Sequence, residues 1–204
     1  SKIKAKFGDS IQLISGNVSN REGFDYMVTE GGVDAVRVGV GSGSICSTRL
    51  KTGHGMPLAA SLLDISKSEH KYSAYIIADG GHKYNGDIAK SLACGADFVM
   101  LGSMLAGHNE SPGKISKING NSYKVYRGMA SKEVKGNTRH IEGIQKLIPV
   151  KGSLQDTLNG IRDSLTSAFS YTGSRNLLEF QKKSELILCS TNSTVENNTH
   201  INFI

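Results

Sequence analysis

Residues 75–101, YIIADGGHKYNGDIAKSLACGADFVML, hold two short apolar runs with a helical pattern between them. The runs are Tyr75–Ala78 and Phe98–Leu101. The segment Gly86–Cys94 repeats apolar side chains at helical spacing, and Gly95 stands where such a helix would end. A strand, a helix and a second strand with short connections predict a βαβ unit whose strands are parallel.

The same alternation continues towards the N-terminus. Two further apolar runs, Ile11–Ile14 and Ala35–Val40, are predicted strands, and residues 21–29 and 58–66 have helical spacing. None of the four runs alternates with polar residues, so we expect all four strands to be buried on both faces. The sequence therefore predicts an α/β fold with a parallel sheet of four core strands.

The remainder of the chain is less regular. Residues 108–152 are polar and glycine-rich without periodicity, and a segment of that length is usually a functional flap or disordered. Helical spacing returns at residues 154–169, and residues 190–204 have the composition of a loose polar tail. We therefore expect one domain over residues 1–189, with a flap at about 108–152.

Composition excludes several classes of protein. The 204 residues carry 24 basic and 18 acidic side chains, a net charge of +6, but the basic residues are scattered. A solubilising surface therefore explains the charge better than a nucleic-acid interface does. No apolar run approaches the length of a membrane span, and the N-terminus lacks the pattern of a signal peptide. The three cysteines, Cys46, Cys94 and Cys189, are far apart, which favours a reduced, cytoplasmic location.

The loop after the second predicted strand, residues 39–49, reads GVGSGSICSTR. Glycines let a backbone turn tightly and leave its amides and carbonyls open to a ligand or an ion. Cys46 lies in this loop close to Arg49, which is a setting for a nucleophilic thiolate. The alternative is an inert cysteine, and that interpretation suits Cys94 and Cys189 better.

Small residues also follow the last two predicted strands, and ligands of such folds bind at the carboxyl ends of strands. Backbone amides at Gly80-Gly81 and Gly102-Ser103 could cradle a phosphate, although Gly-Gly is also a common turn. Asp79 could accept hydrogen bonds from ribose hydroxyls or simply cap a turn. Glu142 is an acid–base candidate or a solvated side chain.

Eight segments occur together in one order over about residues 10–175: Ile14–Val18, Gly39–Arg49, Ile77–Gly81, Gly86–Lys90, Val99–Gly107, Glu110–Gly113, Tyr126–Met129 and Lys151-Gly152. In this respect the chain resembles the family of IMP dehydrogenases and GMP reductases. One such match is weak, but eight in order are specific.

Within that family the chain looks more like a reductase. The supporting features are Lys51-Thr52-Gly53, His108, a short flap without an Arg-Tyr pair, and the segments Lys151–Thr157 and Ser170-Tyr171. Tyr126-Arg127 and Ser42 are also found among dehydrogenases. Two alternatives stay open: an IMP dehydrogenase, which converts IMP to XMP with NAD, and a non-catalytic nucleotide-binding fragment.

The resemblance implies a reaction and its residues. The Cys46 thiolate would attack C2 of GMP, ammonia would leave, and a hydride from NADPH would give IMP. Thr48 and Glu142 would transfer the proton. The implied substrate-binding residues are Ser44, Asp79, Gly80, Gly81, Gly102, Ser103, Met129, Ala130 and Gly143. The carbonyls of Gly41, Gly43 and Cys46 would bind a monovalent cation such as potassium.

The family fold is a parallel (β/α)8 TIM barrel, which needs about 250 residues. This chain matches roughly the second half of such a barrel. The resemblance therefore implies a missing N-terminal half-barrel as a partner, and a homotetramer when full length. Half a barrel leaves two strand edges and an apolar face unpaired, so we expect the chain alone to be inactive.

Overall fold

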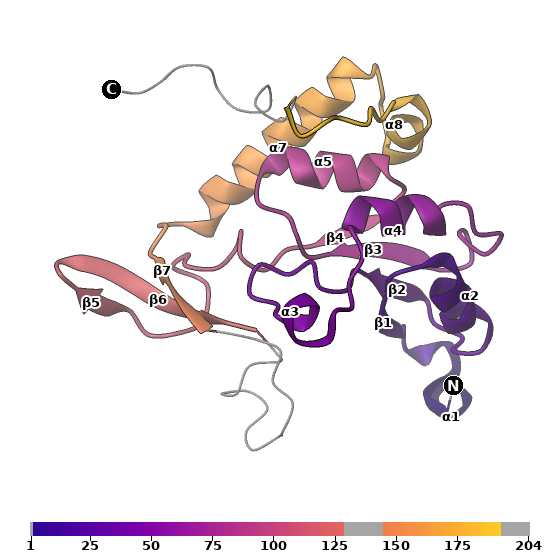
Figure 1. Ribbon diagram of the computed structural model, residues 1–204, viewed down its shortest axis with the longest axis horizontal. Helices are drawn as coiled ribbons and strands as arrows, with labels where there is room; N and C mark the ends of the chain where they lie inside the picture. The colour runs from indigo at the N-terminus through magenta and orange to yellow at the C-terminus, as the bar shows by residue number, and fades with distance from the viewer. Residues whose placement is uncertain (1, 129–144, 193–204) are drawn as a thin grey trace.

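The computed structural model describes residues 2–128 and 145–192, and its sheets confirm an α/β fold with a parallel sheet (Figure 1). The parallel sheet has the order β1-β2-β3-β4, made of Ile14–Val18, Ala35–Val38, Tyr75–Asp79 and Phe98–Met100. The helices are α1 (Lys2–Phe7), α2 (Arg21–Thr29), α3 (Thr48–Thr52), α4 (Leu58–Ile65), α5 (Asn85–Ala93), α7 (Leu154–Tyr171) and α8 (Leu177–Lys183), and a 3-10 turn spans Gly8–Ser10.

Helices begin where short polar side chains satisfy free backbone amides. Asn20 accepts a hydrogen bond from the amide of Gly23 at the start of α2, and Ser153 does the same for Gln155 at the start of α7. Helix α2 has the predicted bounds, and α4, α5 and α7 differ from prediction by one or two residues. Helices α1, α3 and α8 were not predicted.

The first predicted strand was placed three residues too early. Strand β1 begins at Ile14 and continues through Gly16 to Val18, with a register irregularity against β2 between Gly16 and Val18. Its serine and glycine resemble a turn in sequence. Backbone pairing with β2 nevertheless keeps them in the sheet.

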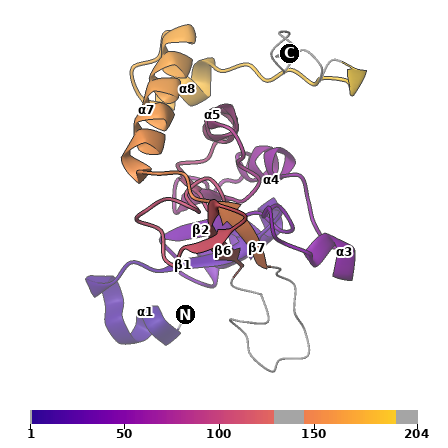
Figure 2. The ribbon, with the colours of Figure 1, turned by 90° about the vertical axis from the view of Figure 1, so that its left-hand side faces the viewer.

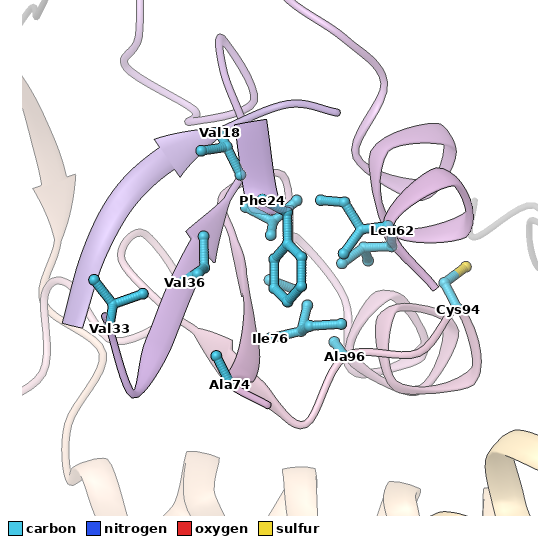
Figure 3. Close-up of a cluster of buried hydrophobic side chains, with 12 residues drawn as sticks. Val18, Phe24, Val33, Val36, Leu62, Ala74, Ile76, Cys94 and Ala96 are labelled. Carbon is cyan, nitrogen blue, oxygen red and sulfur yellow. The ribbon is translucent and has the colours of Figure 1, made fainter. Parts of the chain in front are cut away.

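The core lies between one face of the sheet and helices α2, α4 and α5 (Figures 1 and 3). Val36 and Val38 of β2 meet Phe24 of α2 and Leu62 of α4 there, and all four side chains are fully buried. Helices α7 and α8 form a further layer against α5, as Figure 2 shows. The stacked rings of Phe169 and Phe180, 4.5 Å apart, belong to this second cluster.

The opposite face of the sheet is open in part, because Ala35 and Ile77 on it are buried but other side chains are not. Ile14, Tyr75 and Phe98 lie on this face, and each is more than half exposed. The register pairs Ile14 with Ala35 and Ala35 with Tyr75, whereas Phe98 pairs with Ile77, the next residue of β3 on the same face. The expectation that every strand is buried on both faces was therefore wrong for β1 and β4, which are the edges of the described sheet, and for Tyr75 at the start of β3.

The segment 108–152 also differs from expectation, because its described part contains regular structure. Strands β5 (Ser116–Ile118), β6 (Asn121–Arg127) and β7 (Gln145–Pro149) form an antiparallel sheet beyond the parallel one (Figure 1). Asn119 and Gly120 connect β5 to β6 with φ angles of 49° and 81°. An Asn-Gly pair with positive φ is the turn that joins two antiparallel strands most readily.

Candidate functional site

The carboxyl ends of the four parallel strands meet at two cavities. The larger has a volume of about 530 Å³ and is lined by the loop that contains Cys46 and by residues from all three of β1, β2 and β3. The smaller, of about 80 Å³, lies between the loops after β3 and β4. Both cavities share Gly43, Asp79, Gly80 and Tyr126.

The two cavities bring together the described residues that the sequence singled out. Gly41, Gly43, Cys46, Thr48, Asp79 and Gly80 line the larger cavity. Ser44, Asp79, Gly80, Gly81, Gly102 and Ser103 line the smaller one. The remaining predicted residues, Met129, Ala130, Glu142 and Gly143, lie outside the described residues. The grouping is observed, whereas the role of each residue stays a prediction.

Cys46 lies in the loop between β2 and α3 with an exposed side chain. Its Sγ atom is 3.1 Å from Oγ1 of Thr48, close enough for a hydrogen bond. The Cys46 amide donates to the carbonyl of Gly43 at 3.0 Å, which curls the loop beneath the thiol. The geometry suits a nucleophile with a hydroxyl beside it.

Asp79 ends strand β3 and is held by its neighbours across the sheet. Its Oδ2 atom accepts hydrogen bonds from Arg37 of β2 at 2.6 Å and from Asn17 of β1 at 2.7 Å. None of the described side chains donates to its other carboxylate oxygen. The carboxylate therefore has a fixed orientation and retains an oxygen for a ligand hydroxyl.

Glycine is required in the turn after Asp79. Gly80 and Gly81 have φ angles of 88° and 82°, in the region that favours glycine. A Cβ atom at Gly80 would lie 2.7 Å from the hydroxyl of Ser42. After β4, a Cβ atom at Gly102 would lie 2.7 Å from the Tyr126 hydroxyl. Both turns thus keep their backbones open at the smaller cavity.

Sequence reasoning missed four residues of the site. Asn17 and Arg37 fix Asp79, Tyr126 lines both cavities, and Lys151 supports the turn after β4. The Lys151 ammonium donates to the carbonyls of Ser103 and Met104 at 3.2 Å each, and burial lowers its pKa. Asn17, Tyr126 and Lys151 belong to segments that carry the family resemblance, but the sequence indicates no role for them. Nothing in the sequence predicts the antiparallel sheet that brings Tyr126 and Lys151 to the site.

The loop after Gly81 is tied to α5. His82 is buried, and its Nε2 lies 2.8 Å from the hydroxyl of Ser91. Asp87 accepts hydrogen bonds from the amides of Lys83 and Tyr84. Burial lowers the pKa of His82, and the nearby carboxylates of Asp87 and Asp79 oppose this shift. A neutral His82 therefore anchors the loop that follows β3.

The predicted cation site stays a prediction, and two of its three carbonyls already accept a hydrogen bond. The carbonyl of Gly41 accepts a hydrogen bond of 3.0 Å from the Arg49 guanidinium, and the carbonyl of Gly43 accepts one from the Cys46 amide. A cation held by these oxygens would face the positive charge of Arg49.

A sequence profile described as "IMP dehydrogenase / GMP reductase domain" matches residues 1–200. The chain belongs to this family. Among curated relatives, GMP reductase of Lactobacillus acidophilus is 47% identical over 177 residues, covering 86% of this chain and 52% of the relative. Inosine-5'-monophosphate dehydrogenase of Aquifex aeolicus is 39% identical, covering 98% of this chain and 43% of the relative.

Solved structures of the IMP dehydrogenase and GMP reductase family support the same assignment. GMP reductase from Trypanosoma brucei, determined in complex with guanosine 5'-monophosphate, superposes with a TM-score of 0.90 at 31% identity. The match covers 98% of this chain and 44% of that chain. This chain thus spans about half the length of the relatives it matches. Of its described helices, none has the length and apolar character needed to cross a membrane.

Proposed function

We propose that this chain carries the nucleotide site and the nucleophile of a GMP reductase, which converts GMP to IMP and ammonia with NADPH. The observation that carries the proposal is the placement of Cys46 and Thr48 in a cavity that adjoins a small glycine-lined one. The GMP reductase relatives, at 45–47% identity, are closer than the dehydrogenases, at 36–41%, which supports the reductase reaction.

The two cavities suggest how a nucleotide lies in the site. The phosphate would occupy the smaller cavity, against the turns at Gly80-Gly81 and Gly102-Ser103 with Ser44 beside them, where backbone amides favour an anion. The free oxygen of Asp79 would accept a ribose hydroxyl. The purine would then extend into the larger cavity towards Cys46, with Met129, Ala130 and Gly143 of the flap as further contacts.

The reaction begins at the Cys46 sulfur. The thiolate would form a C–S bond to C2 of GMP, and the bond from C2 to its amino nitrogen would break as the amino group takes up one proton and leaves as ammonia. Thr48, in contact with the sulfur, and Glu142 would pass the proton to that nitrogen. When bound, NADPH supplies a hydride to C2. Loss of the C–S bond then returns the thiolate and releases IMP.

The exposed side chain of Cys46 leaves room near its sulfur for the nicotinamide ring of NADPH. Of the three carbonyls proposed for potassium, those of Gly41 and Gly43 accept hydrogen bonds from Arg49 and Cys46, and the residue roles proposed above do not depend on a cation. The exposed sheet face and the half-length match support a (β/α)8 barrel to which residues 1–189 contribute the second half. We propose the first half as the partner, a homotetramer as the assembly, and no turnover by this chain alone.

Two absorbance assays at 340 nm test the function on this chain joined to the N-terminal part of a GMP reductase relative. GMP with NADPH should give falling absorbance, and a Cys46→Ala variant should lose turnover but keep GMP binding. Rising absorbance with IMP and NAD would instead make the protein a dehydrogenase. Nucleotide binding without a signal in either assay would make it a binding fragment.

A further inference from the structure

The loop that carries Cys46 is tied to strand β3 by the side chain of Ser42. The Ser42 hydroxyl donates a hydrogen bond of 2.7 Å to the backbone carbonyl of Asp79. This bond joins the loop after β2 to the residue whose carboxylate faces the proposed sugar site. Neither the family motifs nor the proposed reaction gives Ser42 a role.

The surroundings of the Ser42 hydroxyl are closely packed. A Cβ atom at Gly80 would lie 2.7 Å from the Ser42 oxygen, and one at Gly39 would lie 2.9 Å from it. Glycine at these two positions therefore leaves the room that the hydroxyl needs to reach Asp79. Ser42 is itself partly buried, so the bond is sheltered from competing water.

Asp79, which accepts this hydrogen bond, is itself held in place by contacts within the sheet. Its carboxylate is held by Arg37 and Asn17, and its backbone pairs with Met100 of β4. The hydrogen bond from Cys46 to Gly43, in contrast, joins two positions of the same loop. Such an internal bond shapes the loop but does not fix it to the sheet.

We propose that Ser42 is a positioning residue, which holds the Cys46 thiol beneath the purine ring by tying its loop to the carbonyl of Asp79. The inference rests on the proposed function, because it assumes a nucleotide whose sugar lies at the Asp79 carboxylate. One residue then serves two parts of the site: its carboxylate meets the sugar, and its carbonyl places the nucleophile.

The test uses this chain joined to the N-terminal part of a GMP reductase relative and measures alkylation of Cys46 by iodoacetamide, followed by mass spectrometry, with and without saturating GMP. The chain carries Cys189→Ser, because Cys189 is exposed, whereas Cys94 is buried and slow to react. The GMP dissociation constant is measured on the same samples. The variants are Ser42→Ala, which removes the donor, and Ser42→Thr, which keeps it. Ser66→Ala is the matched control, because it removes a serine-to-carbonyl bond outside the site.

In the parent chain and in Ser66→Ala, bound GMP should slow alkylation because the purine covers the thiol. In Ser42→Ala this protection should fall by about tenfold, the effect of one lost hydrogen bond, while GMP affinity changes little. Ser42→Thr should recover most of the protection. Unchanged protection in a folded Ser42→Ala, or affinity lost in parallel with protection, would overturn the role of Ser42. Failure of this joined protein to bind GMP would overturn the proposed function, and this inference with it.

Discussion

The two faces of the parallel sheet are built from similar apolar side chains but lie in different surroundings. On the covered face, Val36, Val38 and Ala78 are fully buried against α2 and α4. On the open face, Tyr75 and Phe98 of the neighbouring strands β3 and β4 contact each other edge to face and are more than half exposed. The covered face holds the strands in place, whereas the open face is an exposed apolar surface of the kind that another layer of structure usually covers.

The difference between the two faces indicates which part of this chain supports the site. The loops at the carboxyl ends of the strands depend on the covered face, because the helices behind it fix β2 and β3. The barrel that we propose requires the open face to be covered as well. Nucleotide binding should therefore depend on the first face, and turnover on both.

The largest expected effect comes from opening a cavity in the covered face. Leu62 is fully buried against Phe24 and the sheet, so Leu62→Ala should lower the free energy of unfolding by about 2–5 kcal/mol. Urea unfolding followed by circular dichroism measures the change. A loss below about 1 kcal/mol would mean that this face is not a packed core.

A smaller effect, at the site itself, comes from Asp79→Asn. This change removes the charge that pairs with Arg37 and weakens the acceptor for the sugar, so GMP affinity should fall by about 10- to 100-fold. Isothermal titration calorimetry measures the affinity. Asp163→Asn is the control, since Asp163 forms an exposed ion pair with Arg162 on α7. Equal losses in both variants would contradict a role for Asp79 in the site.

Lower pH should reduce the stability of the folded protein through His82, which lies in the loop after β3. Burial lowers the pKa of this histidine, so the unfolded chain binds a proton at higher pH than the folded one does. Stability should therefore be full above the ordinary histidine pKa of 6.5 and fall as pH drops below it. The carboxylates of Asp79 and Asp87 oppose this lowering of the His82 pKa. Lys90 lines the same cavity as His82. Thermal unfolding between pH 7 and pH 5 should show a smaller loss in His82→Gln; an identical loss would assign the effect to other groups.

The smallest expected effect is on the open face. Phe98→Ser removes a half-exposed ring, so the free energy of unfolding should change by less than about 1 kcal/mol. Self-association, measured by analytical ultracentrifugation, should decrease because the exposed apolar area shrinks. A destabilisation as large as that of Leu62→Ala would show that the two faces do not differ as described.

Much of the sheet could be predicted from the sequence because strands β2 and β3 are mostly apolar and glycines follow them. The exposure of β1 and β4 could not, since an apolar run does not reveal whether a second layer covers it. Asn119-Gly120 did carry a signal for the β5–β6 turn, but the polar composition of residues 108–152 concealed it. The predicted loops after β2, β3 and β4 do meet, as parallel topology requires.

Other parts of the site depend on tertiary contacts. Arg37 lies inside a strand that was interpreted only as buried, and its pairing with Asp79 depends on the register of β2 against β3. The contact of Ser42 with Asp79 likewise needs the folded loop. The spacing of residues along the chain predicts neither of these two contacts with Asp79.

A calorimetric titration of GMP into the 204-residue chain alone tests most directly whether the nucleotide site forms within this chain. If the site forms within this chain, one GMP should bind per chain. The described strand ends line both cavities, and the covered face holds these strands in place. Absence of binding by the chain alone, when the same chain joined to a first half-barrel binds GMP, would contradict this expectation. The site would then belong to the completed barrel and not to this half of the sheet.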